Sequence, residues 1–311
     1  WKPSRNSYLS NYYLMRLMMD AGLPDGVINF IPGKASMIGD ICLSHPMLAG
    51  IHFTGSTSVF RQMWKDVANN LANLRSYPRI VGETGGKDFI VAHPNCDQKA
   101  LTVALIRGAF EYQGQKCSAA SRAYIPESVW NAIKDDYVNE VSKISVGDPK
   151  DFSNFMGAVI DRKSFDNIAG YIDRANRDSG CEIVTGGEYD DSTGYFVQPT
   201  TIVCSDPNYE TMAEEIFGPV LSIYVYPDHE FIETLDLCDN TSEYALTGSI
   251  FAANREDIEV AMGALRYSAG NFYINDKPTG AVVGQQPFGG ARGSGTNDKA
   301  GSPLNLLRWV S

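Results

Sequence analysis

The expected fold class follows from one stretch of the sequence, residues 51–87, which read IHFTGSTSVFRQMWKDVANNLANLRSYPRIVGETGGK. Apolar runs of strand length stand at 51–55 and 79–83, and apolar residues recur at helical spacing over 59–74. We expect the first of these runs to be a buried strand. A strand, a helix and a strand joined by short connections predict a parallel sheet with right-handed crossovers.

The same alternation continues upstream of this stretch. We expect a helix over 7–21, a strand in the run VINFIPG at 27–33 and a short polar helix over 36–44. The first 90 residues are therefore expected to form half of a doubly wound, Rossmann-like nucleotide domain rather than a whole one.

The pattern changes after Lys87 and predicts a second α/β domain. Helices are expected over 98–113, 128–143, 161–178 and 230–240. Strands are expected in FIVAHP, at 122–126, in the pair CEIVTGGEY and YFVQPTTIV, in LSIYVYP and in LTGSIFAAN. We divide the chain into three parts: 1–86, 87–274 and a tail rich in Gly and Pro at 275–311.

Composition excludes several classes of function. The chain has 311 residues, 43% of them hydrophobic, which is enough for a large core. Its net charge of −11 argues against a basic face for nucleic acid or for anionic membranes. No apolar run approaches the roughly 20 residues that span a bilayer, and the first residues, WKPSRNSYLSNYY, do not read as a secretory or transit segment. We therefore expect neither a nucleic-acid partner nor membrane insertion.

The cysteines and histidines do not form a recognisable metal or disulfide pattern. The six cysteines are scattered, and the four histidines show no ligand spacing to one another or to the cysteines. We expect free thiols in a reducing compartment and no bound metal.

Two glycine-containing motifs stand where strands end. In FTGST, residues 53–57, Gly55 permits close backbone approach and Ser56 adds a hydroxyl at a helix start, which suits a cofactor phosphate. An ordinary strand-to-helix turn with an N-cap is the alternative. In ETGGK, residues 83–87, Glu83 follows a strand and could be a general base. A solvated Glu83 beside a plain glycine turn is the alternative.

The stretch GQKCSAASR, residues 114–122, presents Cys117 among small and polar residues. Small neighbours leave room for a substrate, and the adjacent Lys116 would favour the thiolate. A buried structural thiol is the alternative. With Glu83 upstream, a nucleophilic cysteine with a general base is suggested but not established.

The order of the motifs carries more information than any one of them. FTGST, ETGGK, GQKCSAASR, EEIFGP at 214–219 and PFGG at 287–290 occur in this sequence. Together they resemble the aldehyde dehydrogenase superfamily, over nearly the whole chain, and imply its fold: a partial nucleotide domain at 1–86, a catalytic domain at 87–274 and a substrate-anchor tail at 275–311.

The resemblance implies roles for named residues. Cys117 matches the nucleophile that attacks the aldehyde, and Glu83 matches the base that activates the deacylating water. The residues that match contacts to the NAD cofactor are Lys2 and Ser4 in the adenosine-ribose segment KPS, Gly55 and Ser56 at the pyrophosphate, and Glu215 and Phe217 at the nicotinamide. A preference for NAD over NADP is only a leaning, because the discriminating part of the fold lies upstream.

Narrower features resemble the branch of this family that oxidises glutamate 5-semialdehyde to glutamate in proline breakdown. They are ETGGK, GQKCSA and the run TGAVVGQQPFGGARGSGTNDKAG at 279–301. The resemblance implies that Ser118, Gly280 and Ala281 hold the α-carboxylate of the substrate and that Phe288 packs on its aliphatic part. Small residues in a loop let several N–H groups converge on one carboxylate, although a plain turn is the alternative for Gly280–Ala281.

The family is longer at both ends than this sequence. We therefore expect a fragment that lacks several strands and the upstream asparagine of the oxyanion hole, with apolar strand edges exposed. The resemblance further implies a homodimer or higher homo-oligomer in the mitochondrial matrix. Three alternatives remain: an aldehyde dehydrogenase with another substrate, an inactive fragment that only associates with intact subunits, and a thiol esterase that needs no NAD.

Overall fold

A computed structural model describes residues 1–310 and divides the chain into two compact units. The first unit comprises Trp1–Ile51 and Ser58–Ile80, and the second comprises His52–Thr57 and the chain from Val81 onward. The three functional domains expected from the sequence are a different kind of division, and they stay a prediction.

The first unit is built mainly from helices. They are η1 (Arg5–Ser7), α1 (Tyr8–Asp20), α2 (Ala35–Ser44), most of α3 (Thr57–Asn70) and η2 (Leu71–Asn73). The helices expected over 7–21, 36–44 and 59–74 are thus confirmed. Neither α1 nor α2 buries a residue, and Leu9, Leu17 and Ile41 are exposed. Apolar side chains of these helices are therefore exposed, whereas the sequence had led us to expect exposed strand edges.

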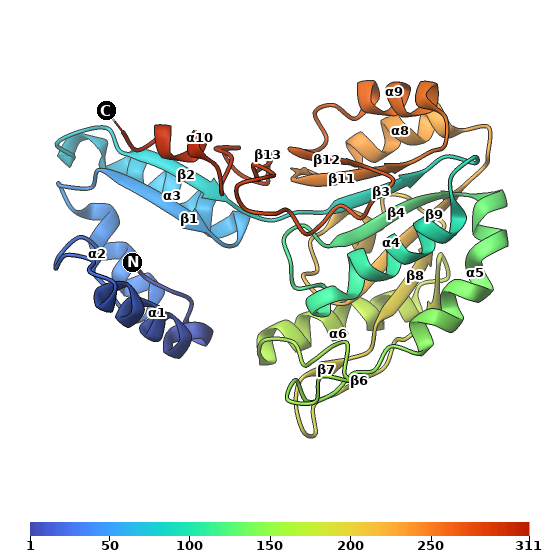
Figure 1. The fold of residues 1–311 in the computed structure, drawn as a ribbon, viewed down its shortest axis with the longest axis horizontal. Helices are drawn as coiled ribbons and strands as arrows, with labels where there is room; N and C mark the ends of the chain where they lie inside the picture. Colours follow the sequence, from blue (N-terminus) through green and yellow to red (C-terminus); the bar gives the residue numbers. More distant parts are fainter. Residues whose placement is uncertain (311) are drawn as a thin grey trace. The chain divides into compact units, whose positions relative to one another are not determined.

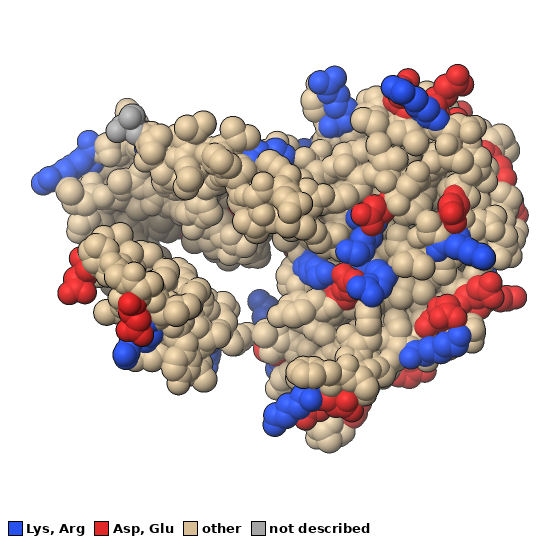
Figure 2. All heavy atoms as spheres, in the orientation of Figure 1, with Lys and Arg blue, Asp and Glu red and all other residues tan. Residues whose placement is uncertain are grey.

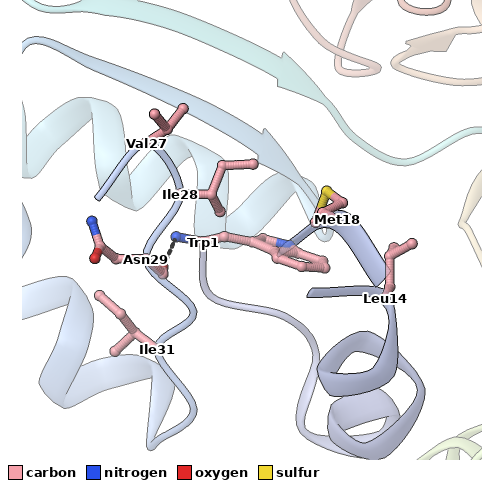
Figure 3. Close-up of a pocket in the computed structure, with 7 residues that line it drawn as sticks. All are labelled: Trp1, Leu14, Met18, Val27, Ile28, Asn29 and Ile31. Atoms are coloured by element: carbon pink, nitrogen blue, oxygen red, sulfur yellow. Dashed lines mark hydrogen bonds between the residues drawn. The ribbon is translucent and has the colours of Figure 1, made fainter. Parts of the chain in front are cut away.

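The strand expected at 27–33 is wrong. Within the described chain, this run forms no strand ladder. The amino group of Trp1 donates to the Asn29 carbonyl at 2.7 Å, the Ile31 N–H donates to the Trp1 carbonyl at 2.9 Å, and the N–H and carbonyl of Gly33 bond to the Tyr8 hydroxyl. Figure 3 shows the Trp1 ring pointing toward Leu14 and Met18, in an open apolar pocket of about 700 Å³. One residue of pairing is too little for a strand, which needs a ladder of hydrogen bonds.

Strands β1 (Gly50–Thr54) and β2 (Arg79–Glu83) form a two-stranded sheet. Both were expected from the sequence, but β1 is not buried: its residues are half-buried or exposed. An apolar run indicates burial only when both faces of the strand are covered. By contrast, β2 is buried over its last four residues, and its carboxyl end from Val81 onward belongs to the second unit.

The second unit contains a seven-stranded sheet in the order β12-β11-β3-β4-β9-β8-β5. All neighbours in it are parallel except β5 and β8. The strands are β3 (Asp88–Ala92), β4 (Ala120–Pro126), β5 (Cys181–Thr185), β8 (Thr200–Cys204), β9 (Val220–Tyr226), β11 (Thr247–Phe251) and β12 (Asn271–Ile274). Two small pairs complete the strands: β6 (Tyr189–Asp190) with β7 (Phe196–Val197), and β10 (Tyr244–Ala245) with β13 (Ala291–Arg292).

Helices cover both faces of this sheet, which gives two apolar cores (Figure 1). One face packs against α4 (Gln98–Phe110) and α5 (Glu127–Ser142). The other packs against α6 (Arg162–Arg177), α8 (Phe231–Asn240) and α9 (Arg255–Ala264). Two short helices complete the second unit: α7 (Glu210–Ala213), between β8 and β9, and α10 (Pro303–Leu307), the last element of the chain. A mostly parallel sheet covered on both faces confirms the expected α/β class and fits the near-continuous apolar runs of its strands.

The segment that leads to the cysteine loop is tightly wound. Helix α4 ends at Phe110 and the 3₁₀ turn η3 (Glu111–Gly114) follows, so the helix expected over 98–113 is shorter than predicted. Tyr112, Gln113 and Gly114 all have positive φ, at 57°, 58° and 61°. Side chains rarely adopt this left-handed conformation, and successive residues in it reverse the chain sharply. The turn directs residues 115–119 toward the edge where β4 begins.

Candidate active site

A cavity of about 1000 Å³ lies within the second unit. Its walls come from segments far apart in the sequence: the end of β1, the loop after β2, the cysteine loop, the start of α6, residues 215–217 and the tail after β12. Nine of the twelve predicted site residues line it: Gly55, Ser56, Cys117, Ser118, Glu215, Phe217, Gly280, Ala281 and Phe288. The structure therefore brings the predicted nucleophile, cofactor side and substrate side together.

Cys117 is half-buried in the wall of this cavity. Burial, more than any other cause, raises the pKa of its thiol to about 12. The carboxylates of Asp88, Glu215 and Glu83 act in the same direction. The thiol is therefore protonated near neutral pH, and nucleophilic attack first requires loss of that proton.

The expectation that Lys116 favours the Cys117 thiolate is wrong. The Lys116 ammonium donates to Glu111 at 3.0 Å, and the charges that raise the pKa of Cys117 are negative. The left-handed turn at 112–114 places Glu111 beside Lys116 and so neutralises the charge that the sequence had suggested.

The two glycines of ETGGK make room for neighbouring groups. A Cβ atom on Gly86 would lie 2.1 Å from the Cys117 carbonyl oxygen, and one on Gly85 would lie 2.6 Å from Glu215 Oε2. The Gly86 N–H also donates to Glu215 Oε1 at 2.8 Å. The approach to the Cys117 backbone requires glycine at 86, and a side chain at 85 would displace the Glu215 carboxyl group. The motif therefore joins the cysteine loop to the predicted cofactor residue Glu215.

Glu83 does not line the cavity, although its neighbours Thr84 and Gly85 do. Its side chain is buried, with 7% of the residue exposed, and neither carboxylate oxygen has a hydrogen-bond partner within residues 1–310. Burial raises its pKa to about 8; the charge of Lys299 lowers it, and that of Asp298 raises it. A carboxyl group with a pKa near neutrality suits a general base, so this finding supports the predicted role of Glu83.

The cofactor side of the cavity offers the donors and acceptors that a dinucleotide needs. Gly55 and Ser56 line the wall immediately before α3, and a Cβ atom on Gly55 would lie 2.6 Å from the Phe53 ring. The carboxyl group of Glu215, which is half-buried, can accept hydrogen bonds from ribose hydroxyls. Phe217 is held at φ 57° with 43% of its surface exposed, so it presents an aromatic ring to the cavity. These residues fit a nicotinamide dinucleotide.

The predicted substrate side of the cavity is formed by the cysteine loop and the tail. Ser118 Oγ and Thr279 Oγ1 are 2.8 Å apart, and Lys277 Nζ donates to the Thr279 carbonyl at 3.1 Å. Gly280 follows at φ +96°, a conformation that favours glycine. Both contacts are made at Thr279, so they fix the residue that immediately precedes Gly280 and Ala281 in the cavity wall.

Lys2 and Ser4 belong to the first unit. Lys2 Nζ donates to the Pro3 carbonyl, and the Ser4 carbonyl accepts from the Ser7 N–H at the start of η1. Their assignment to the adenosine ribose stays a prediction from the resemblance.

Sequence reasoning missed several residues at this site. Thr279 was not chosen, although it stands next to Gly280 and its hydroxyl meets that of Ser118. Lys163 and Asn167 of α6 also line the cavity. Nothing in the sequence indicated them, because a helix of the second domain reaches the site only through the tertiary fold.

Two further findings bear on the kind of site. Residues 1–310 contain no cluster of three or more His, Cys, Asp or Glu side chains that could hold a metal ion. None of the helices described is both long and apolar enough to cross a bilayer. On the face shown in Figure 2, Lys and Arg side chains of the second unit lie beside Asp and Glu side chains rather than in one basic patch.

Comparison with known proteins defines the class. The model of the aldehyde dehydrogenase family matches residues 1–309, and the chain belongs to this family. Among curated relatives, the mitochondrial delta-1-pyrroline-5-carboxylate dehydrogenases of Dictyostelium discoideum and Homo sapiens are 56% and 49% identical over the whole chain. The chain spans about half the length of these relatives, 56% and 55% respectively.

Solved structures agree with this assignment. The chain matches the NAD-bound delta-pyrroline-5-carboxylate dehydrogenase of Mycobacterium tuberculosis with a TM-score of 0.94 and 53% identity, covering all of this chain and 57% of that one. An NAD-bound 1-pyrroline-5-carboxylate dehydrogenase from Thermus matches with a TM-score of 0.91 and 32% identity, again over all of this chain and 58% of that one. The predicted aldehyde dehydrogenase fold is confirmed.

Proposed function

We propose that the full-length protein oxidises L-glutamate 5-semialdehyde to L-glutamate with NAD. The observation that carries this proposal is the placement of Cys117 in one cavity between the residues that fit a dinucleotide and the loop of Ser118, Thr279, Gly280 and Ala281. The names of the relatives support the same reaction, because 1-pyrroline-5-carboxylate is the cyclic form of glutamate 5-semialdehyde.

The first half of the reaction uses Cys117. Its thiolate attacks the aldehyde carbon and forms a thiohemiacetal, while the α-carboxylate of the substrate is held by the N–H groups of Gly280 and Ala281 and by Ser118. NAD, when bound, accepts the hydride that turns the thiohemiacetal into a thioester. Gly55, Ser56, Glu215 and Phe217 would hold this cofactor.

The second half uses Glu83. Its carboxylate takes a proton from the water that attacks the thioester carbon, the C–S bond breaks, and the electron pair returns to the Cys117 sulfur. Covalent catalysis thereby divides one difficult oxidation into two easier steps. A carboxyl group that is protonated below a pKa of about 8 predicts hydrolysis that accelerates as the pH rises toward that value.

We also infer, from the resemblance alone, a homodimer or higher homo-oligomer in the mitochondrial matrix. The relatives from Dictyostelium discoideum, Homo sapiens and Danio rerio are named as mitochondrial enzymes. Size-exclusion chromatography with light scattering and subcellular fractionation test the two inferences separately.

The test of the reaction compares two aldehydes on one preparation of the full-length protein. NADH formation is followed by absorbance with glutamate 5-semialdehyde and with pentanal, which lacks the α-carboxylate and the α-amino group. We expect kcat/KM to be at least about a hundredfold higher for the semialdehyde, since several charge-assisted hydrogen bonds distinguish the two. Equal values would favour an aldehyde dehydrogenase of another substrate, and ester hydrolysis without any NADH formation would favour a thiol esterase.

A further inference from the structure

Lys299 lies in a loop whose backbone is held in an unusual conformation. Asn297 and Lys299, which follow β13, have φ values of 55° and 53°. Residues with side chains seldom adopt such angles, and they persist where surrounding contacts fix them. The contacts that fix this loop therefore also fix the position of Lys299.

The Lys299 side chain is fixed by two backbone carbonyls. Its ammonium donates to the carbonyl of Gly270 at 2.9 Å and to that of Gly289 at 3.3 Å. An ammonium group has three donors, so these two bonds leave one N–H available. Both acceptors are neutral carbonyls, so neither bond pairs the ammonium charge with a carboxylate.

Glu83 lies on the other side of Gly289. The point that a Cβ atom of Gly289 would occupy is 2.9 Å from Glu83 Oε1, 3.3 Å from Asn297 Oδ1 and 3.3 Å from the Lys299 backbone nitrogen. The absence of a side chain at Gly289 thus lets the Glu83 carboxyl group, Asn297 and Lys299 meet around one position.

The two charged groups that act on the pKa of Glu83 both belong to the tail. Lys299 and Asp298 act from the tail, and Glu83 acts in turn on Cys117 across the site. Asp298 already accepts from Thr296 Oγ1 and lies 3.7 Å from Arg308. Of the two groups that act on Glu83, Lys299 is the cation. The effect is mutual: the charge of Glu83 raises the pKa of Lys299, whereas burial, the larger cause, lowers it.

We propose that Lys299 is a positioning residue for thioester hydrolysis, whose ammonium, anchored on the Gly270 and Gly289 carbonyls, favours the carboxylate form of the buried Glu83. The inference rests on the proposed function in that Cys117 carries the thioester. Without a nearby cation, an isolated carboxylate in this buried position would be strongly disfavoured relative to the neutral acid. The neutral acid cannot take the proton of the attacking water.

The test uses p-nitrophenyl acetate, which acylates a cysteine and needs neither the natural aldehyde nor NAD. A burst of p-nitrophenolate reports acylation of Cys117, and the steady rate after it reports hydrolysis of the acyl-enzyme. In the full-length protein we compare Lys299→Met, Lys299→Arg and the control Lys150→Met. Lys150 is exposed in a turn between α5 and α6 and does not line the cavity.

We expect Lys299→Met to keep the burst and to lower the steady rate about tenfold at pH 7. In a plot of the steady rate against pH, the acid limb of Lys299→Met should lie about one pH unit higher than that of the wild type. The steady rates of the two proteins should therefore converge at high pH. Lys299→Arg should restore most of the lost rate, and Lys150→Met should match the wild type. If Lys299 had only a structural role, its replacement would lower the steady rate equally at every pH. Thermal unfolding of each variant serves as the control that identifies a misfolded preparation.

The outcomes separate the two proposals. A normal burst with an unmoved acid limb in Lys299→Met would overturn the role of Lys299 and leave the proposed function standing. A wild type that shows the burst and the pH effect but forms no NADH from glutamate semialdehyde would overturn the proposed function alone.

Discussion

Replacing Gly280 by valine should remove the preference for a substrate that carries an α-carboxylate. Gly280 sits at φ +96°, and a Cβ atom there would lie 3.0 Å from Lys277 Nζ, which ties the loop through the Thr279 carbonyl. A branched side chain can relieve the strain only if the loop moves, and movement displaces the N–H groups of Gly280 and Ala281. Each charge-assisted hydrogen bond contributes about 1.5–3 kcal/mol, so losing one should lower kcat/KM about ten- to a hundredfold.

The assay measures kcat/KM for glutamate 5-semialdehyde and for pentanal on the same preparation of Gly280→Val, with NAD affinity as a check on folding. The control is Gly26→Val, since Gly26 has a similar φ of +84°, lies in the first unit and has open space around its missing side chain. We expect a steep loss for the semialdehyde and little change for pentanal. Equal losses for both aldehydes would refute the assignment of the loop to carboxylate binding.

Three other predictions concern Cys117 and Glu83. Cys117→Ser should lower turnover by more than about a thousandfold, while the affinity for NAD, measured by fluorescence titration, stays unchanged. A variant that keeps a tenth of the wild-type activity would show that Cys117 is not the nucleophile. Glu83→Gln should show a burst of NADH followed by slow turnover in stopped-flow measurements, and loss of the burst would mean that Glu83 acts before the thioester forms. The pKa of Cys117 is raised to about 12, so the rate of its alkylation by iodoacetamide without NAD should rise about tenfold per pH unit up to pH 9. Peptide mass spectrometry follows this rate, and a rate that levels off near pH 7 would contradict the raised pKa.

Most of the fold could be predicted because the strands of a parallel sheet covered on both faces are apolar throughout and the helices between them are amphipathic. The exception at 27–33 shows the limit of this reasoning. An apolar run forms a strand only if another strand lies beside it, and the backbone contacts of this run, to Trp1, Tyr8 and Pro24, form no ladder. Helix α9 and strand β12 were not predicted, although β12 is half-buried at the edge of the sheet.

The candidate site could be predicted where a motif sits at the end of a strand or in a loop that needs glycine. Its electrostatics could not be predicted in this way. The effect of Lys116 depends on the position of Glu111, which is set by three left-handed residues that no sequence pattern indicated. The effect of Lys299 on Glu83 likewise depends on the tertiary fold, because the space that Gly289 leaves lies 2.9 Å from Glu83 Oε1 and 3.3 Å from the Lys299 backbone nitrogen.

The most direct test of the account is the identity of the covalent intermediate. The full-length Glu83→Gln protein is mixed with glutamate 5-semialdehyde and NAD, quenched in acid to keep the substrate amine protonated, digested and analysed by peptide mass spectrometry. The account predicts that one peptide, the one containing Cys117, gains the mass of a single glutamyl group as a thioester, in an amount equal to the NADH formed in the burst. NADH formation with an unmodified Cys117 peptide, or with the adduct on another residue, would contradict it.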